Sequence, residues 1–232
     1  MGDDNKANWI RSIRKEHKIH FICIQETQFS EISKFKLGYL WGKSNFEFEG
    51  MGASGRSGGL LSIWEPGIFQ KSFVVAKKNF LLISGILLGF NVTMNVVNVY
   101  GPHSLNEKKE LWAELEKLRH ERDGVWVFVG DFNEVRYPSE RLNSEFYPQG
   151  ANLFNQFIFN AQLMEFNMSG HPFTFMRGLG SSYSKLDRFL VCNEFVNKWP
   201  YACARVLPRH LSDHCPIILT ATNIDFGPPP PV

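Results

Sequence analysis

Short apolar segments alternate with turn residues along this chain, and that alternation constrains the fold more than any other feature of the sequence. Segments of roughly four to eight apolar residues end at turn-forming residues, as at Gly101-Pro102 and Gly130-Asp131, which is typical of buried β-strands. Between them lie stretches whose apolar residues recur at helical spacing. The combined pattern predicts an α/β protein.

The apolar segments mark the expected strands. They cover residues 21–25, 60–64, 69–75, 80–88, 91–100, 125–129, 186–191, 202–207 and 217–220, with Thr174 in or beside a further strand. Those between residues 60 and 100 follow one another along the chain, and consecutive strands joined by short turns favour antiparallel pairing. We therefore expect a mostly antiparallel sheet to start at residue 60.

Three stretches have helical spacing: residues 5–18, the stretch that begins at Ser104, and residues 153–161. In the second, Ser104 and Glu107 have the spacing of a capping box, in which each side chain accepts a hydrogen bond from the other residue's backbone amide. We expect a helix in each stretch.

The composition excludes several classes of protein. The hydrophobic set makes up 44% of the residues and charged residues 21%, which is ordinary for a globular domain and argues against disorder, collagen and coiled coil. The net charge is only +2, so a polyanion would have to be held by local contacts. Glycines interrupt the longest apolar stretch, residues 80–90, well short of the roughly 20 residues of a membrane span.

The simplest organisation is one domain, residues 1–222, followed by a frayed proline-rich tail at residues 223–232. The cysteines have no C-x-x-C spacing and no secretory segment precedes them, which argues against a zinc ribbon or a disulfide framework. We expect reduced thiols in a soluble nuclear or cytoplasmic protein that does not bind membranes.

Four polar clusters lie at the ends of apolar segments. They are Gln25-Glu26-Thr27, Gly130-Asp131-Phe132-Asn133, Ser184-Lys185-Leu186-Asp187 and Ser212-Asp213-His214. Each alone is an ordinary turn, helix start or solvated strand end. Ligands of α/β proteins gather beyond strand ends, and together these clusters supply hard oxygen ligands and a histidine with a carboxylate partner. Such a set suits a metal-assisted phosphate hydrolase.

In order and spacing, these clusters resemble the motifs of the endonuclease/exonuclease/phosphatase superfamily. The resemblance runs from about Asn8 to Thr220 and includes Asn98-Val99-Tyr100 and Leu186-Asp187-Arg188. It implies a four-layer α/β sandwich of the DNase I type, in which two packed, mostly antiparallel sheets are flanked by helices. The implied activity is metal-dependent phosphodiester hydrolysis.

Finer motifs resemble one branch of that superfamily, the endonuclease domain that plant LINE-type (non-LTR) retrotransposons carry ahead of their reverse transcriptase. They are Tyr100-Gly101-Pro102-His103, the Glu140-Arg141 pair, Phe173-Thr174-Phe175, the segment 185–191, Leu207-Pro208-Arg209 and the ending at residues 223–228. This resemblance implies DNA as the substrate, nicking of an insertion target, and a reverse transcriptase domain as the partner in the parent element.

The resemblance also implies a role for each matching residue. Glu26 would hold a divalent cation, with Mg²⁺ favoured and Mn²⁺ as the alternative, and Asp213 would join the metal shell. His214 would contact the scissile phosphate or move a proton, with Asp187 fixing its orientation. Asp131 would orient or deprotonate the attacking water.

Further residues complete the implied site. Tyr100 and Asn133 would donate hydrogen bonds to phosphate oxygens. His103, which takes the place of an asparagine in many relatives, would contact the substrate, as would Thr174 and Ser212. No small-molecule cofactor is implied.

One departure from the superfamily concerns the front of the chain. Members begin with a central strand that ends in a Trp-Asn motif, whereas this sequence starts at Met1-Gly2-Asp3, directly before the helix of residues 5–18. We expect that strand to be missing, which would leave neighbouring strand edges unpaired and weaken turnover. Two other functions stay open: a phosphohydrolase for inositol phosphates or phospholipids with the same fold, and a catalytically silent remnant.

Overall fold

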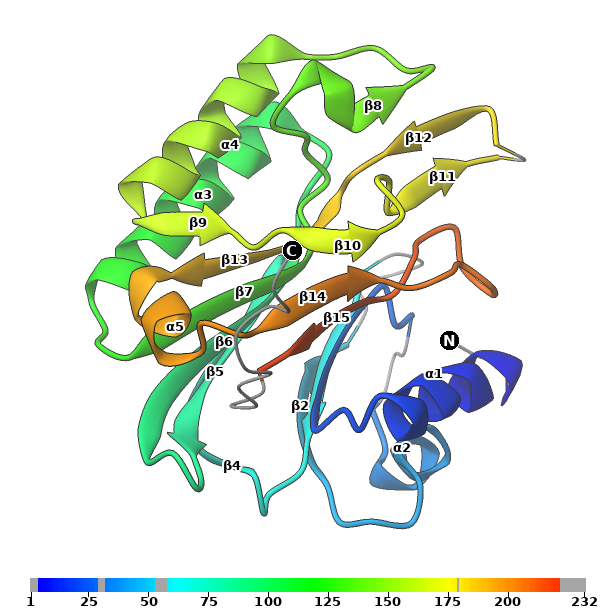
Figure 1. Cartoon of the computed structure of the whole chain (residues 1–232), viewed down its shortest axis with the longest axis vertical. Coiled ribbons are helices and arrows are strands. Elements are labelled where there is room, and N and C mark those ends of the chain that lie inside the picture. Colours follow the sequence, from blue (N-terminus) through cyan, green and yellow to red (C-terminus); the bar gives the residue numbers. More distant parts are fainter. Residues whose placement is uncertain (1–3, 29–31, 53–57, 179, 222–232) are drawn as a thin grey trace, which may run out of the picture.

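The structure is a computed structural model, and it describes residues 4–28, 32–52, 58–178 and 180–221. The tail expected at residues 223–232 lies outside these residues. The elements form four layers, with helices on the two outer faces and sheets between them (Figure 1). This confirms the expected sandwich.

The largest sheet has six strands in the order β4-β5-β6-β7-β13-β9. Their bounds are β4 (Phe69–Lys77), β5 (Phe80–Leu87), β6 (Val92–Tyr100), β7 (Val125–Asp131), β13 (Asp187–Cys192) and β9 (Leu163–Glu165). All neighbours are antiparallel except β6 and β7. The helix α3 (Leu105–His120) connects these two strands, because parallel neighbours need a long crossover.

Two three-stranded sheets share the layer that faces the six-stranded sheet. One has the order β1-β3-β2, with β1 (Phe21–Gln25), β3 (Leu60–Trp64) and β2 (Glu47–Met51). The other has the order β10-β14-β15, with β10 (Met168–Gly170), β14 (Cys203–Val206) and β15 (Ile217–Thr220). β1 and β3 pack against β6 of the large sheet, and β15 packs against β13.

A smaller sheet projects from one end of the sandwich, beside the short helix η1 (Pro138–Glu140). It consists of β8 (Arg141–Leu142), β12 (Ser182–Ser184) and β11 (Phe175–Arg177), and the last two form a hairpin. The hairpin stands beside the strand ends that carry the polar clusters of the sequence.

The helices cover the outer faces of the sandwich. α3 and α4 (Pro148–Asn160) lie on one side, and α1 (Asp4–Glu16) and α2 (Lys34–Trp41) lie on the other (Figure 1). The short helix α5 (Asn193–Lys198) follows β13 directly. No described helix combines the length and the apolar character that crossing a membrane requires.

Two helix starts differ from expectation. Ser104 precedes α3, but its side chain makes no capping hydrogen bond, so the capping box is not formed. α4 begins at Pro148 instead of residue 153, because the fixed φ of proline suits the first turn of a helix and proline has no amide to leave unpaired there.

The main core lies between the six-stranded sheet and the helices α3 and α4. Trp112 of α3 stacks on Phe157 of α4 with ring centroids 5.1 Å apart, and Phe154 and Phe132 contact the same indole ring. Phe132 is fully buried and directly follows Asp131. The aromatic core therefore anchors the end of β7 from below.

The pairing of the strands that start at residue 60 is only partly as expected. β4, β5 and β6 are antiparallel neighbours, but β3 pairs with β1 and β2 in the other sheet layer. β3 is buried along its whole length, with β1 and β2 as its partners and the large sheet packed against it. The sequence could not assign β3 and β4 to different sheets, because both appear in it only as short apolar segments.

β1 lies at an edge of its sheet, as β15 does in the neighbouring sheet. Among the described residues, β1 pairs only with β3, and β15 pairs only with β14. All five residues of β1 are half-buried although most are apolar, in contrast to the buried β3. The lack of a central strand stays a prediction, because every open sheet has edge strands.

Candidate active site

Three site residues lie in one row across the central strands of the large sheet. Tyr100 is the last residue of β6, Asp131 the last of β7 and Asp187 the first of β13. The strand register pairs Tyr100 with Asp131, and Asp131 with Asp187. The parallel strands β6 and β7 end at the edge where the antiparallel β13 begins, so the topology brings the three side chains together.

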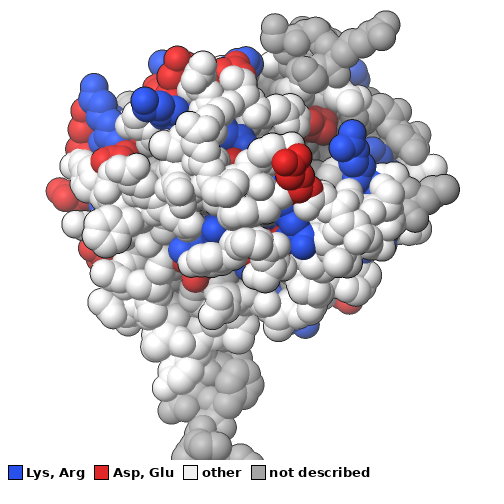
Figure 2. Space-filling model, turned by 90° about the horizontal axis from the view of Figure 1, so that it is seen from above, with Lys and Arg blue, Asp and Glu red and all other residues white. Residues whose placement is uncertain are grey.

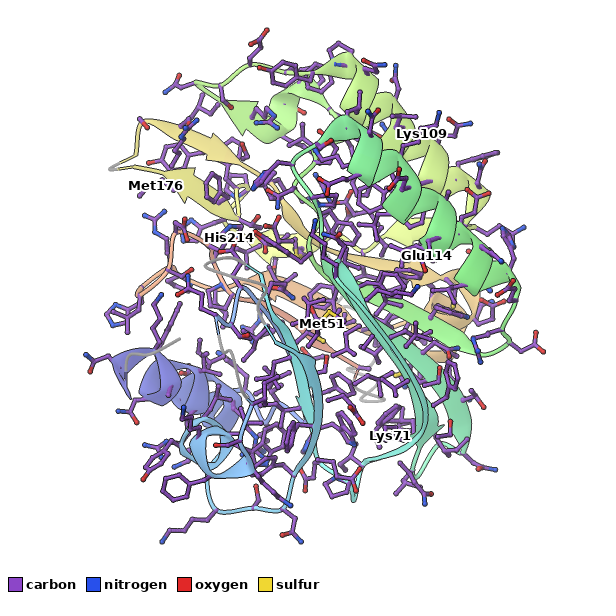
Figure 3. The ribbon with its side chains drawn as sticks, turned by 180° about the vertical axis from the view of Figure 1, so that it is seen from behind. Met51, Lys71, Lys109, Glu114, Met176 and His214 are labelled. Carbon is purple, nitrogen blue, oxygen red and sulfur yellow. The ribbon has the colours of Figure 1, made fainter. Side chains whose placement is uncertain are left out.

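His214 reaches this row from the segment before β15. Its Nδ1 donates to Asp187 Oδ2 at 2.8 Å, and its Nε2 lies 3.9 Å from Asp131 Oδ2. The ring packs on Phe175 of the hairpin with centroids 4.8 Å apart. Figure 3 shows His214 between the hairpin that carries Met176 and the helix α1.

Burial and neighbouring charges set the protonation of this cluster. Burial raises the pKa of Asp131 to about 7, and the nearby Asp187 carboxylate acts in the same direction. Burial would lower the pKa of His214, but attraction and the hydrogen bond to Asp187 outweigh it and raise that pKa to about 9. At neutral pH the imidazolium is therefore paired with Asp187, and Asp131 exchanges its proton readily.

Asn133 holds Asp131 in place. Its backbone N–H donates to Asp131 Oδ1 at 2.8 Å, and its Nδ2 donates to Asp131 Oδ2 at 3.0 Å and to the Gly101 carbonyl at 2.8 Å. Its φ of 49° is in the left-handed region, which asparagine tolerates better than most residues. Gly101 must be glycine, because a Cβ there would lie 2.1 Å from the Phe132 carbonyl oxygen.

Glu26 lies on the other side of Tyr100. It is exposed and directly follows β1, with a φ of 51°. The Tyr100 hydroxyl donates a hydrogen bond to Glu26 Oε1. Burial and this carboxylate raise the pKa of Tyr100, so its phenol remains a hydrogen-bond donor.

The buried side chain of Asn98 fixes β1 beside β6 and so places Glu26. Its Nδ2 donates to the carbonyls of Ile24 at 3.3 Å and Leu61 at 3.0 Å, and its Oδ1 accepts from Gln25 Nε2 at 2.5 Å. One asparagine of the large sheet therefore bonds to both β1 and β3 of the facing layer.

The remaining expected residues have mixed placements. Asp213 is exposed at the rim, accepts from Ser212 Oγ at 3.4 Å, and helps to raise the pKa of His214. Ser212 Oγ also accepts the His214 backbone N–H at 3.1 Å. His103 is exposed and has no hydrogen bond or ion pair to any residue that the structure describes.

Thr174 is buried beneath the site. Its Oγ1 accepts the backbone N–H groups of Leu186 and Asp187, both at 2.9 Å, and its exposed fraction is 1%. The expected substrate contact does not suit this placement, because the hydroxyl is already shared by two amides. The position favours a supporting role for Thr174, in which it holds Asp187.

The structure therefore brings Asp131, Asp187 and His214 together, with ligand atoms within 4.8 Å of one another. Tyr100 joins them to Glu26, and Asp213 flanks His214. The expected metal pair, Glu26 and Asp213, is not part of the tight group.

Several residues that support the site have no role assigned from the sequence. Four of them, Gln25, Asn98, Glu140 and Arg188, belong to motifs that the sequence analysis recognised, so the sequence did point to them. Nothing in the sequence indicated that Lys108 supports the site, because a lysine in a helix is usually solvated. Here Lys108 is buried and donates to the Asn133 carbonyl at 2.6 Å.

The donor set fits a divalent cation. Carboxylates outnumber the one imidazolium, since Glu26, Asp131, Asp187 and Asp213 share the site. No lysine or arginine of the described chain is hydrogen-bonded or ion-paired to them. Burial is the main cause of the raised pKa of Asp131, and the neighbouring carboxylates of Asp187 and Glu26 add to it. Carboxylate oxygens are the ligands that Mg²⁺ and Mn²⁺ prefer.

A DNase I-like sandwich with an Asp–His pair and clustered carboxylates at its strand ends defines a class of hydrolases. The sequence matches the endonuclease/exonuclease/phosphatase family over residues 2–214, and the chain therefore belongs to this family. No curated protein matches the sequence.

Solved structures share the fold at low sequence identity. The 3′ phosphatase NExo from Neisseria, bound to a product DNA hairpin, has a TM-score of 0.72 and 16% identity, with 94% of each chain covered. The AP endonuclease LMAP from Leishmania major has a TM-score of 0.71 and 14% identity over 92% of this chain and 81% of that one. The endonuclease domain of TRAS1, a telomere-specific non-LTR retrotransposon, has a TM-score of 0.68 and 14% identity over 93% and 91%.

Proposed function

We propose that the protein is a metal-dependent DNA endonuclease of retrotransposon origin, which hydrolyses a phosphodiester to leave a 3′-hydroxyl and a 5′-phosphate. The observation that carries this proposal is the hydrogen-bonded Asp187–His214 pair beside Asp131, with Tyr100 in the same row and Glu26 bonded to it. The likeness to TRAS1 supports the retrotransposon origin, and the DNA-bound NExo structure supports DNA as the substrate.

The metal would be held at the exposed side of the row. Glu26 and Asp213 are the candidate ligands, with Mg²⁺ favoured and Mn²⁺ as the alternative. A bound divalent cation would supply Lewis-acid polarisation of the phosphate.

The residues of the chain would handle the protons. The His214 imidazolium would donate to a phosphate oxygen, with Asp187 fixing the ring. Asp131, with a pKa of about 7, would accept the proton of the attacking water near neutral pH. Asn133 would keep Asp131 oriented. The single O–H of Tyr100, which donates to Glu26 in this structure, would turn to the phosphate when metal and substrate bind.

DNA would be held by local contacts and not by bulk charge. The net charge is +2, and Figure 2 shows lysines and arginines interspersed with acidic residues on the face seen from above. We therefore expect modest affinity for non-specific DNA and a shallow dependence on salt.

The open edge of β1 bears on the expected rate. Among the described residues, Glu26 follows a strand that has a partner on one side only, so its carboxylate would be less firmly placed than Asp131 or Asp187. We therefore expect turnover that is slow and strongly dependent on metal concentration.

The test compares three substrates with Mg²⁺ and with EDTA: supercoiled plasmid, inositol polyphosphate and sphingomyelin. Asp187→Asn removes the imidazole partner. Glu114→Gln removes a carboxylate on α3 (Figure 3) that pairs with Lys77, and it serves as the matched control. We expect Mg²⁺-dependent nicking of plasmid, lost in Asp187→Asn and kept in Glu114→Gln.

Other outcomes would point elsewhere. Release of phosphate from inositol polyphosphate or cleavage of sphingomyelin, without nicking, would replace the nuclease by a phosphohydrolase of the same fold. Inactivity on all three substrates would indicate a silent remnant and would contradict the proposal.

A further inference from the structure

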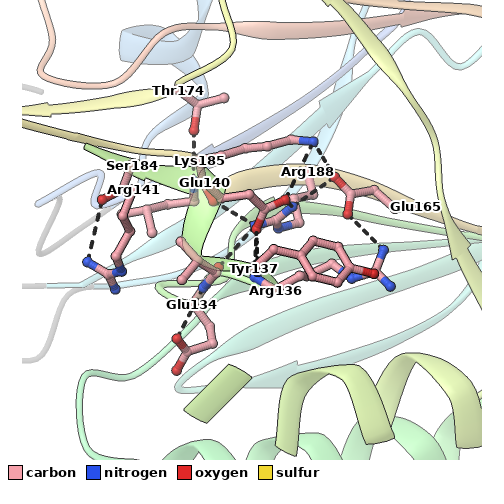
Figure 4. A network of polar contacts seen from close by, with 12 residues as sticks. Glu134, Arg136, Tyr137, Glu140, Arg141, Glu165, Thr174, Ser184, Lys185 and Arg188 are labelled. Atoms are coloured by element: carbon pink, nitrogen blue, oxygen red, sulfur yellow. Dashed lines mark hydrogen bonds and ion pairs between the residues drawn. The ribbon is translucent and has the colours of Figure 1, made fainter. Parts of the chain in front are cut away.

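A buried network of charged side chains lies on the face of β13 opposite to Asp187, and Figure 4 shows it from close by. Its centre is Arg188, which has no accessible surface. The guanidinium donates to both oxygens of Glu140, at 2.9 Å and 2.7 Å, and to Glu165 Oε1 at 2.8 Å. Arg188 follows Asp187 on β13, so the two side chains point to opposite faces of the sheet.

The network joins the two segments that carry site residues. Arg188 Nη2 donates to the Lys185 carbonyl at 2.7 Å and to the Glu134 carbonyl at 3.4 Å. The first carbonyl lies two residues before Asp187, and the second directly follows Asn133. One guanidinium therefore sets the spacing between the two segments.

Glu140 reinforces the same connection from its own side. Its Oε2 accepts the backbone N–H of Arg136 at 2.6 Å, and its backbone carbonyl accepts the Lys185 N–H at 2.9 Å. The loop between Asn133 and Glu140 is thus held at both of its ends by groups that also hold the start of β13.

Stability alone does not account for such a network. Taking charges out of water is costly, and replacing a buried ion pair by apolar side chains of similar volume is often neutral for stability or raises it. The hydrogen bonds of a guanidinium are directional, unlike the contacts of an apolar group, so its donors fix the positions of several acceptors at once. The acceptors here include the backbone groups that set Asp131, Asn133 and Asp187 relative to one another.

We propose that Arg188 and Glu140 are positioning residues, which fix the spacing between the Asn133–Glu134 turn and the Lys185–Asp187 segment and so align Asp131 and Asp187 on His214. The kinetic part of this inference rests on the proposed nuclease function. Neither side chain reaches the exposed side of the site, since Arg188 is fully buried and the Glu140 side chain is 12% exposed. Loss of the pair therefore lowers kcat and leaves KM unchanged.

The test separates positioning from stability with an apolar double variant. Arg188→Met leaves Glu140 without its partner and lowers Tm, whereas the double variant Arg188→Met/Glu140→Leu removes both charges and recovers part of that loss. Arg188→Lys keeps the charge but loses the fork. Val191→Ala removes buried methyl groups at the far end of β13 and is the control for lost stability.

All variants are assayed at a temperature at which each is fully folded. We expect kcat for plasmid nicking to fall at least about tenfold in Arg188→Lys and in the double variant, with KM unchanged. Val191→Ala should keep the kcat of the original chain despite its lower Tm. Recovery of kcat together with Tm in the double variant would overturn the proposal.

A second readout does not depend on activity. Backbone amide chemical shifts in the double variant should change mainly at residues 133–134 and 185–187. In Val191→Ala, the shifts at these residues should stay as they are in the original chain. If the unaltered chain fails to nick DNA, the proposed function fails, whereas localised amide shifts would still uphold the positioning role. Unchanged shifts at those residues would overturn it.

Discussion

The two halves of the candidate site are built in different ways. Asp131 and Asp187 are each 6% exposed and lie at strand ends of a six-stranded sheet, where β7 and β13 have partners on both sides. Glu26 is exposed and follows β1, which has an open edge among the described residues. The two carboxylates that would serve proton transfer are therefore buried in the large sheet, while the carboxylate that would bind metal is exposed next to an edge strand.

This difference shows what each kind of chemistry needs from the fold. Burial raises the pKa of Asp131, whereas the fixed contact with Asp187 raises the pKa of His214 against the effect of burial. Glu26, the proposed metal ligand, is exposed, and one of its carboxylate oxygens accepts a hydrogen bond from Tyr100. The two halves meet through Tyr100 and Asn98, so the integrity of the site depends on few contacts.

The largest expected effect belongs to the buried half. His214→Ala should lower the rate of plasmid nicking about 10³-fold, within the range for loss of a general acid or base. Single-turnover nicking with saturating Mg²⁺ measures the change, with Glu114→Gln as the control. A loss below about tenfold would show that His214 stands outside the chemistry.

Loss of the hydrogen bond from Tyr100 to Glu26, which links the two halves of the site, should have the next largest effect. Tyr100→Phe removes the hydroxyl that contacts Glu26 and is expected to lower kcat about 10²-fold, as for one donor to a developing charge. The same nicking assay gives the value, and Tm should stay unchanged because the partner carboxylate is exposed to water. A large fall in Tm with normal kcat would instead assign Tyr100 a structural role.

The tether between the sheets is tested by a matched pair of variants on β6. Asn98→Ala removes the side-chain donor to the carbonyls of Ile24 and Leu61 and should lower the free energy of unfolding by about 1–3 kcal/mol. Asn95→Ala removes bonds to Ser84 and Asp123 within the large-sheet side. Denaturant unfolding measures both.

Asn98→Ala should also slow nicking, because Asn98 places β1 and Glu26. Asn95→Ala should leave the nicking rate unchanged, because Asn95 contacts neither. Equal effects of both variants on kcat would show that the tether does not act on the site.

The smallest expected effect is on pH-dependent stability. In EDTA, the pKa of Asp131 is about 7 in the folded chain, above its ordinary value. Ionising this group therefore costs stability as pH rises toward neutrality. Asp131→Asn lacks this cost, so its Tm advantage over the unaltered chain should grow from about pH 5 to about pH 8.

The size of that advantage should be roughly 2–4 °C for each kcal/mol at this chain length. His214 acts in the opposite sense. Its raised pKa stabilises the fold at low pH, and this contribution is lost as pH rises through about 9. A gap between the two proteins that shrinks from about pH 5 to about pH 8 would contradict the assigned pKa of Asp131.

Much of the fold could be predicted because its strands end where the sequence changes character. β1, β3 and β15 have the expected bounds, and Glu26, Asp131 and Asp187 lie at or next to strand ends. These features are local, since an apolar run followed by a turn residue is written in consecutive positions. The family motifs then ordered the site residues along the chain.

What could not be predicted depends on contacts between distant segments or on surfaces that break the local pattern. The helix α2 was not predicted. Its Phe35 and Tyr39 side chains are exposed, so its apolar residues show no clear helical spacing. The burial of Arg188 follows from tertiary pairing with Glu140 and Glu165. The expected substrate contact does not suit Thr174, because two backbone amides already share its hydroxyl. Those amides belong to residues 12 and 13 positions further along the chain, so no local pattern in the sequence indicated them.

If Glu26 binds metal while Asp187 serves proton transfer, the two residues should differ in a Mg²⁺ titration of nicking by Glu26→Gln and Asp187→Asn. We expect Glu26→Gln to need at least about tenfold more Mg²⁺ for half-maximal rate and to recover at high Mg²⁺. Asp187→Asn should keep the original half-saturation and remain slow throughout. Identical metal dependence in the two variants would contradict the division of the site into these halves.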